Sequence, residues 1–217
     1  MGYMLTVLIG YLLGSIPTGF LVAKARGVDI RTVGSGNIGA TNVFRILGKP
    51  AGVFVLLADA AKGWVAAFVV ARWMSGWFYP DAGLTAREWF ALVAGLAAIL
   101  GHNYTCWLYF KGGKGIATSA GVLAALVPVP LLVILAVWTG VFACSRYVSL
   151  ASIAAAFTLP FAAWLFAETK TMIVVTAALA ALAIYKHKAN IQRLLAGTEN
   201  RIGAKKTTAS DAPKASA

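Results

Sequence analysis

The sequence is poor in charge. Lys, Arg, Asp and Glu together make up 12% of the 217 residues, about half of the roughly 25% that is typical of a soluble domain. Hydrophobic residues make up 60%, and the mean hydropathy is +0.79. These values exclude an ordinary soluble domain and predict an integral membrane protein.

Acidic residues and metal-ligating residues are also scarce. Seven Asp and Glu residues stand against 19 Lys and Arg, and there are only two histidines and two cysteines. Cys106 and Cys144 lie near the ends of separate apolar segments, so they provide neither a disulfide framework nor a CxxC metal site. We therefore expect no metal site. The positive charges lie between apolar runs without a nucleic-acid-binding motif, so we expect no nucleic-acid partner.

The apolar runs predict an all-α integral membrane protein with seven transmembrane helices, two of them short. The runs cover residues 3–23, 51–74, 89–108, 116–127, 131–144, 149–166 and 172–185. The run 116–127 spans only about 18 Å as a helix, against a hydrocarbon core of roughly 30 Å. Pro128 and Pro130 separate it from the next short run. We prefer a hairpin of two short helices to one kinked helix, which would leave six spans.

The distribution of Lys and Arg predicts the orientation. Fifteen fall in the segments that seven spans put on one side, and three, Arg72, Arg87 and Lys170, fall on the other. By the positive-inside rule, the N-terminus lies outside, and the C-terminus and the glycine-rich loops are cytoplasmic. We expect residues 1–202 to form a single membrane domain and residues 203–217 to form a basic, disordered cytoplasmic tail.

Residues 34–42, GSGNIGATN, form a polar, glycine-rich island between apolar runs. Its glycines permit backbone conformations that other residues avoid. Ser35 or Asn37 is expected to cap a helix over residues 38–47, whose free N–H groups and dipole would attract an anion. Arg45 lies further along that helix. The pattern predicts a phosphate site; the alternative is a tight turn and an interfacial helix without a ligand.

Residues 110–119, FKGGKGIATS, repeat this design, with glycines and lysines before a helix start. The segment is not a nucleotide P-loop, because Gly115 follows Lys114 where a P-loop has Ser or Thr, and a membrane helix precedes it instead of a strand. Two such loops indicate sites for two phosphates.

A third polar motif, HKANIQRLL, covers residues 187–195. His187 and Asn190 are three residues apart and share a helix face. The alternative is an amphipathic helix on the membrane surface without a site. Elsewhere, Asp59 and Lys62 are expected to pair inside the second span, and His102 is left open between helix packing and function.

Three motifs in this order, GSGNIGATN, GHNYTCWLYFKGGKG and HKANIQRLLAGTE, resemble those of the bacterial acyl-phosphate:glycerol-3-phosphate acyltransferases, the PlsY family. The resemblance covers almost the whole chain. It implies a multi-pass enzyme of the bacterial inner membrane, with its active site facing the cytoplasm. Such an enzyme transfers an acyl group from acyl phosphate to the 1-hydroxyl of glycerol 3-phosphate. The products are lysophosphatidate and inorganic phosphate, in phospholipid biosynthesis, with membrane lipid as surroundings and without a cofactor or an obligate protein partner.

The resemblance also implies residue roles. Catalytic roles fall on Ser35, Arg45, Lys114, His187 and Asn190. Substrate-binding roles fall on Gly34, Gly36, Asn37, Thr41, Asn42, Gly112, Gly113, Arg146 and Ser149. Whether His187 or the substrate phosphate accepts the proton is open, as is the loop that holds each phosphate, and an acyl-Ser35 intermediate is a third route.

Two other classes of protein compete with an enzyme. A transporter for an organic phosphate also has basic loops and broken helices, but the polar motifs all lie on one predicted side. No charged residue other than Asp59 and Lys62 marks a path across the membrane. A scaffold protein with a basic amphipathic tail would leave both glycine-rich loops unexplained.

Overall fold

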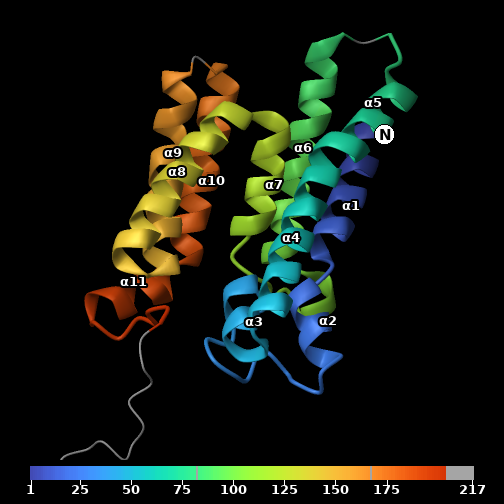
Figure 1. The fold of residues 1–217 in the computed structure, drawn as a ribbon. Coiled ribbons are helices and arrows are strands. Elements are labelled where there is room, and N and C mark those ends of the chain that lie inside the picture. Colours follow the sequence, from blue (N-terminus) through green and yellow to red (C-terminus); the bar gives the residue numbers. More distant parts are fainter. Residues whose placement is uncertain (82, 167, 204–217) are drawn as a thin grey trace, which may run out of the picture.

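The computed structural model describes residues 1–81, 83–166 and 168–203. These residues form helices and loops with no strand among them, which confirms the all-α prediction. The α-helices are α1 (Gly2–Ser15), α2 (Thr18–Lys24), α3 (Ala40–Leu47), α4 (Lys49–Trp64), α5 (Ala71–Phe78), α6 (Leu84–Asn103), α7 (Ile116–Leu126), α8 (Pro128–Ser145), α9 (Val148–Leu165), α10 (Lys170–Lys186) and α11 (Lys188–Leu195). A π-helix (Val65–Val70) joins α4 to α5, and a 3₁₀ turn (Cys106–Leu108) follows α6. Figure 1 shows two neighbouring groups, α1–α7 and α8–α11.

Among the described residues, five helical segments are long and apolar enough to cross a membrane. They are Gly2–Lys24, Lys49–Phe78, Thr85–Leu108, Pro128–Ser145 and Val148–Leu165. Helices α10 and α11, bent by 58° at their junction, make a sixth if they count as one span. Helix α7 is apolar but has only 11 residues. Each predicted apolar run is therefore largely helical, while seven crossings and their orientation stay a prediction.

The prediction of a short helix over residues 131–144 is wrong. Helix α8 begins at Pro128 and has 18 residues, about 27 Å of helix. Its prolines lie in the first turn, where the missing N–H breaks no intrahelical hydrogen bond. The chain turns at Val127 (φ −142°, ψ 69°) between α7 and α8, so the kinked single helix is also excluded and only α7 is short.

The first predicted span, residues 3–23, is not a continuous helix. It breaks between α1 and α2 because Pro17 disfavours a helical conformation at Ile16. The break leaves two backbone carbonyls without helical partners. Thr105 Oγ1 donates to the carbonyl of Ser15 at 2.6 Å, and Lys62 Nζ donates to that of Ile16 at 2.8 Å.

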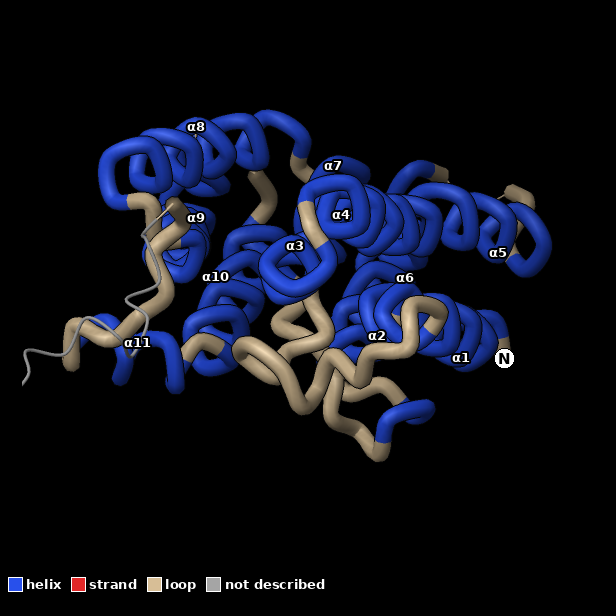
Figure 2. Tube along the Cα trace, turned by 60° about the horizontal axis from the view of Figure 1, so that its bottom comes forward, coloured by secondary structure: helices blue, strands red, loops and turns tan. Residues whose placement is uncertain are grey.

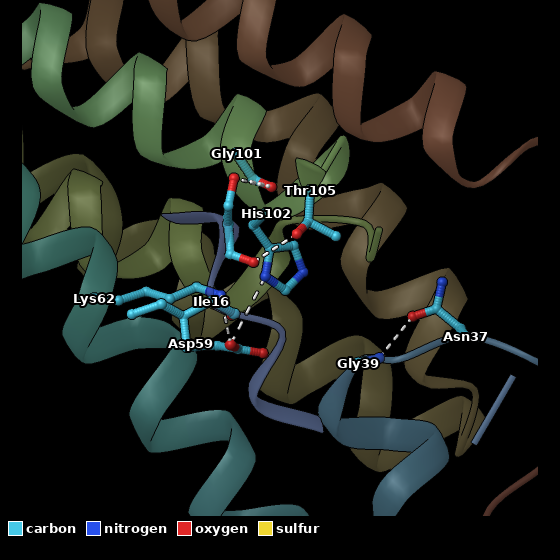
Figure 3. A network of polar contacts seen from close by, with 9 residues as sticks. Ile16, Asn37, Gly39, Asp59, Lys62, Gly101, His102 and Thr105 are labelled. Atoms are coloured by element: carbon cyan, nitrogen blue, oxygen red, sulfur yellow. Dashed lines mark hydrogen bonds and ion pairs between the residues drawn. The ribbon is translucent and has the colours of Figure 1, made fainter. Parts of the chain in front are cut away.

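The predicted pair of Asp59 and Lys62 forms, with 2.9 Å between Oδ1 and Nζ. Figure 3 shows this buried pair beside the imidazole of His102, whose Nδ1 lies 3.7 Å from Asp59 Oδ1. The same imidazole occupies the space that a side chain at Gly113 would need. His102 therefore packs between a buried charge pair and the second glycine-rich loop.

All three polar motifs lie at one end of the molecule. Figure 1 shows α2, α3 and α11 together at this end, and the N-terminus and the α5–α6 and α9–α10 connections at the other. Figure 2, turned so that this end comes forward, shows the loops gathered there. The prediction that residues 203–217 are disordered lies outside the described residues, apart from Gly203.

Candidate functional site

The first glycine-rich loop is held in shape by Asn42. The Nδ2 group of this buried side chain donates to the carbonyls of Ile30, Val33 and Asn37 at 3.2, 3.1 and 3.0 Å. Its Oδ1 accepts from the N–H of Ser35 at 2.9 Å. Both ends of the amide are thus bonded within the loop. The structure gives Asn42 a loop-shaping part, and its contact with a substrate stays a prediction.

Gly34 and Gly36 adopt positive φ angles of 61° and 68°, a region that strains residues with a Cβ. A Cβ at Gly34 would also overlap Asn42 Oδ1. The backbone course around Ser35 therefore depends on glycine on both sides, and it leaves Ser35 exposed at this end of the molecule.

Helix α3 begins at Ala40, two residues later than predicted, and no side chain caps it. The prediction that Ser35 or Asn37 caps this helix is wrong. Asn37 Oδ1 accepts instead from the N–H of Gly39 at 2.8 Å, before the helix starts. In the described residues, the N–H groups of Ala40 and Thr41 have no protein acceptor, and nor does the Thr41 hydroxyl. Such unpaired amide groups favour an anion.

The second loop is docked on the end of α6. Gly112 and Gly113 donate their N–H groups to the carbonyls of Asn103 and His102, at 3.3 and 3.0 Å. A Cβ on either glycine would overlap residues at the end of α6. The amide groups of these two glycines are therefore not free for a ligand. Their docking positions Lys114, which lies just before Gly115 and the start of α7.

Lys114 belongs to a polar cluster that draws on distant parts of the chain. Its ammonium donates to Asn190 Oδ1, and Asn190 Nδ2 donates to Glu199 Oε1 at 2.9 Å. The Ser149 hydroxyl donates to the same oxygen at 3.1 Å, and Arg193 Nε pairs with Oε2 at 2.7 Å. Three of the predicted residues, Lys114, Asn190 and Ser149, are thus brought together.

Sequence reasoning missed Glu199, which joins this cluster. Its side chain is only 5% exposed. Burial lowers the pKa values of both Lys114 and Arg45, and the charge of Glu199 opposes that lowering. One feature of the sequence could have pointed to it. Glu199 is the single acidic residue between Lys186 and Lys206, a segment otherwise rich in basic residues. Sequence reasoning that looks for phosphate ligands selects basic and polar residues, so it does not select an acidic residue that orients the cations.

Burial lowers the pKa of Lys114 to about 8, with Glu199 opposing the shift and Arg193 adding to it. Arg45 on α3 is also affected by the charges of Glu199 and Arg193. Among the described residues, no side-chain hydrogen bond joins the loop 34–42 to Lys114 or Asn190. Arg45, on the helix that begins within the first motif, therefore interacts with the charges of the cluster with no hydrogen bond to it in the described part of the chain.

His187 lies at the junction between α10 and α11, outside both helices. Burial, and then the charge of Lys114, lower its pKa to about 4, so the imidazole is neutral at pH 7. Its Nδ1 contacts the carbonyl of Ala183 at 2.8 Å. Because a carbonyl only accepts, Nδ1 carries the hydrogen and Nε2 presents a lone pair. The ring can accept a proton through Nε2.

Arg146 lies at the edge of this arrangement. It ends α8 with a positive φ of 62°, and its carbonyl accepts from the N–H of Ile202 at 3.0 Å. Its side chain is exposed and has no hydrogen bond to another described residue. Its predicted part in substrate binding stays a prediction. Across the described residues, no three His, Cys, Asp or Glu side chains gather where they could hold a metal ion.

A narrow apolar cavity of about 70 Å³ lies beside the cluster, between α7, α8, α9 and α10. Ile116 and Ser119, just after Lys114, line it, as does Ala183, whose carbonyl contacts His187. A second cavity of about 320 Å³ is lined by charged residues near the other end, including Arg72, Arg87 and Glu168, and by none of the predicted site residues.

Comparison with known proteins gives consistent matches. A family model described as glycerol-3-phosphate acyltransferase matches residues 4–197. The glycerol-3-phosphate acyltransferase of Geotalea daltonii is 47% identical over 197 residues, covering 90% of this chain and 96% of that protein. The enzyme of the same name from Geobacter sulfurreducens is 46% identical over 196 residues, covering 90% and 95%.

The fold is also similar to that of a solved membrane protein. That protein is PlsY (YgiH), described as an integral membrane glycerol 3-phosphate acyltransferase. Its glycerol 3-phosphate form matches with a TM-score of 0.83 at 42% identity, over 94% of this chain and 96% of the other. Its lysophosphatidic acid form matches with a TM-score of 0.80 at 41% identity, over the same shares.

Proposed function

This chain belongs to the glycerol-3-phosphate acyltransferases, a family of integral membrane enzymes, and from this premise we propose the donor, the products and the site. The donor is acyl phosphate, and the acceptor is the 1-hydroxyl of glycerol 3-phosphate. The products are lysophosphatidate and inorganic phosphate, which makes the reaction a step of phospholipid biosynthesis. The enzyme works without a metal, a cofactor or an obligate protein partner.

One observation carries this proposal, the polar cluster around Lys114, which lies two residues before Ile116 in the lining of an apolar cavity. Both substrates carry phosphate, and the cluster provides cations from Lys114, Arg193 and Arg45. The acyl chain needs apolar surroundings, which the cavity lined by Ile116, Leu123 and Ala183 offers. A site that joins cations to an apolar cavity suits a lipid-like anion and a small soluble phosphate together.

The reaction needs positioning and charge stabilisation. The acceptor hydroxyl oxygen attacks the carbonyl carbon of acyl phosphate, a C–O ester bond forms, and the C–O bond to phosphate breaks. Phosphate leaves with the electron pair, and the hydroxyl proton passes to a base. Placed cations near the phosphates and the developing oxyanion lower the barrier of such a step. We assign these parts to Lys114 and Arg45, and phosphate binding to the loop around Ser35.

Two groups compete to accept the proton, His187 and the phosphate of the substrate. The neutral His187 ring presents a lone pair on Nε2, but its pKa of about 4 makes it a weak base at pH 7. In this scheme the acyl group passes directly between substrates, and Ser35 binds phosphate without forming an acyl ester.

We further propose seven crossings of a bacterial inner membrane, with this end of the molecule in the cytoplasm. Support comes from the excess of Lys and Arg in the segments gathered at this end. Glycerol 3-phosphate, a soluble metabolite, would then reach the site directly from the cytoplasm.

The donor is tested with purified protein in detergent or in vesicles. Lysophosphatidate should form from acyl phosphate and glycerol 3-phosphate, without added metal, and acyl-CoA should not replace acyl phosphate. Equal activity with acyl-CoA would overturn the proposed donor. Uptake of labelled glycerol 3-phosphate into vesicles without acylation would instead favour a transporter.

The activity should also fall in alkaline solution. The pKa of Lys114 is lowered from 10.5 to about 8 by burial, so its ammonium loses its proton and its attraction for phosphate as the pH rises through about 8. Because kcat/KM reports ionisations of the free enzyme, we expect kcat/KM to decline above pH 8. In Lys114→Arg any remaining activity should lack this decline, since a guanidinium stays charged. A wild-type profile that is flat from pH 7 to 9.5 would exclude Lys114 as the titrating group.

A further inference from the structure

The two groups of helices meet at the site end, and each contributes part of the site. The group α1–α7 carries Lys114, whereas the group α8–α11 carries His187 and Asn190. Apolar residues of α7, such as Val122 and Leu123, pack against α8, α9 and α10 deeper in the structure. The relative placement of the polar side chains at the site end needs further contacts, because reacting groups must be held to within fractions of an ångström.

Lys186 makes such a contact across the two groups. It is the last residue of α10 and directly precedes His187. Its Nζ donates to the carbonyl of Asn103, at the end of α6, at 3.1 Å. The same carbonyl accepts from the N–H of Gly112 at 3.3 Å. One carbonyl with two lone pairs therefore joins the segment that carries His187 to the loop that carries Lys114.

The acceptor side of this contact is itself held firmly. Asn103 is buried, with 1% of its surface exposed. The ammonium of Lys186 also lies 4.4 Å from the ring centroid of Tyr104, which is within the range of a cation–π interaction. The Tyr104 carbonyl accepts from the hydroxyl of Tyr11, on α1, at 2.6 Å. Lys186 thus binds to a fixed point on the first group.

The half-buried Lys186 pairs with no carboxylate among the described residues. Its ammonium is held instead by a carbonyl and an aromatic ring. These contacts hold two segments together, whereas the neighbouring Lys188, exposed on α11, lies 5.1 Å from the ring centroid of Tyr185, within its own group. The two lysines form a matched pair, of which one connects the groups and the other does not.

We propose that Lys186 is a positioning residue, which sets the placement of His187 and Asn190 relative to the Lys114 loop. Its kinetic consequences rest on the proposed function, whereas its effect on the distance between the two groups does not. It contacts neither substrate in this scheme and acts through the carbonyl of Asn103.

The kinetic test compares Lys186→Met, Lys186→Arg and Lys188→Met. A misplacement of about 1 Å lowers turnover by about 10²-fold, so we expect Lys186→Met to lower kcat by about 10- to 100-fold. KM for glycerol 3-phosphate should change less, because Lys186 does not contact the substrate. Lys186→Arg keeps a cation that can donate and stack, and should recover most of the activity. Lys188→Met should match the wild type. Equal kcat in the two Met variants would overturn the proposal.

A distance measurement tests the placement without relying on the reaction. The native cysteines are first replaced by Cys106→Ala and Cys144→Ala. Spin labels are then attached at Lys111→Cys and Leu195→Cys, two exposed positions that report on the two groups. Lys186→Met should broaden or shift the distance distribution, and Lys186→Arg and Lys188→Met should not. An unchanged distribution in Lys186→Met overturns the proposal even if the donor assignment fails. A change in distance with an inactive wild type would support the placement and reject the proposed donor.

Discussion

Replacing Lys114 by alanine is expected to lower kcat/KM for acylation of glycerol 3-phosphate by at least about 10²- to 10³-fold, the loss typical when one placed donor is removed. The physical reason is its position. Lys114 is held by the docking of Gly112 and Gly113 on α6 and by Asn190. Its ammonium brings a positive charge into a partly buried site, where an electrostatic interaction with phosphate is stronger than in bulk water. Steady-state kinetics of purified variants measure the loss.

Lys111→Ala is the matched control, because Lys111 lies in the same loop but is exposed. It should keep near-wild-type turnover. The thermal unfolding midpoint of Lys114→Ala should stay close to that of the wild type. Removing this half-buried cation leaves no buried carboxylate without a partner, because Glu199 still pairs with Arg193. Wild-type turnover in Lys114→Ala would remove this residue from the site.

Replacing Glu199 by alanine is expected to impair both stability and activity. The carboxylate accepts from Asn190 and Ser149 and pairs with Arg193. Removing one partner of a fully buried ion pair costs about 3–5 kcal/mol, and the cost is smaller here because the Arg193 side chain is 35% exposed and can be solvated. The thermal unfolding midpoint in detergent should therefore fall clearly, and kcat should fall because Asn190 and Lys114 lose their fixed positions.

Glu199→Gln separates charge from shape. Glutamine retains an acceptor for Asn190 but removes the negative charge. Because the charge of Glu199 raises the pKa of Lys114 in the wild type, its removal should lower that pKa. The alkaline decline in kcat/KM should therefore move to lower pH in any remaining activity of Glu199→Gln. The exposed Glu88, replaced as Glu88→Gln, controls for loss of an acid elsewhere. A stable, fully active Glu199→Ala would show that the cluster does not depend on its carboxylate.

Much of the fold was predictable because hydropathy reports directly on the length of apolar helices. The exceptions lie at prolines. Pro17 interrupts the first apolar run without making it less apolar, so hydropathy alone conceals the break. Pro128 and Pro130 suggested a break between two short helices. A proline in the first turn is compatible with the helix that follows, and α8 begins at Pro128.

The sequence motifs selected residues that the fold does bring together, such as Lys114 and Asn190, while their roles in a site stay a prediction. The contacts were not predictable where a side chain reaches across the chain. Asn42 holds the loop from inside α3, although capping rules point to residues before the helix. Glu199 lies 85 residues beyond Lys114 in the sequence, and spacing along one helix contains no information about that contact.

The central claim is that acyl phosphate is the donor and that the site around Lys114 transfers its acyl group to glycerol 3-phosphate. The most direct test follows both products from acyl phosphate labelled in the acyl chain. We predict that labelled lysophosphatidate and inorganic phosphate appear in equal amounts, only when glycerol 3-phosphate is present. Lys114→Ala should lower the formation of both by at least about 10²-fold. Phosphate release without glycerol 3-phosphate, or lysophosphatidate formed only from another donor, would contradict the account.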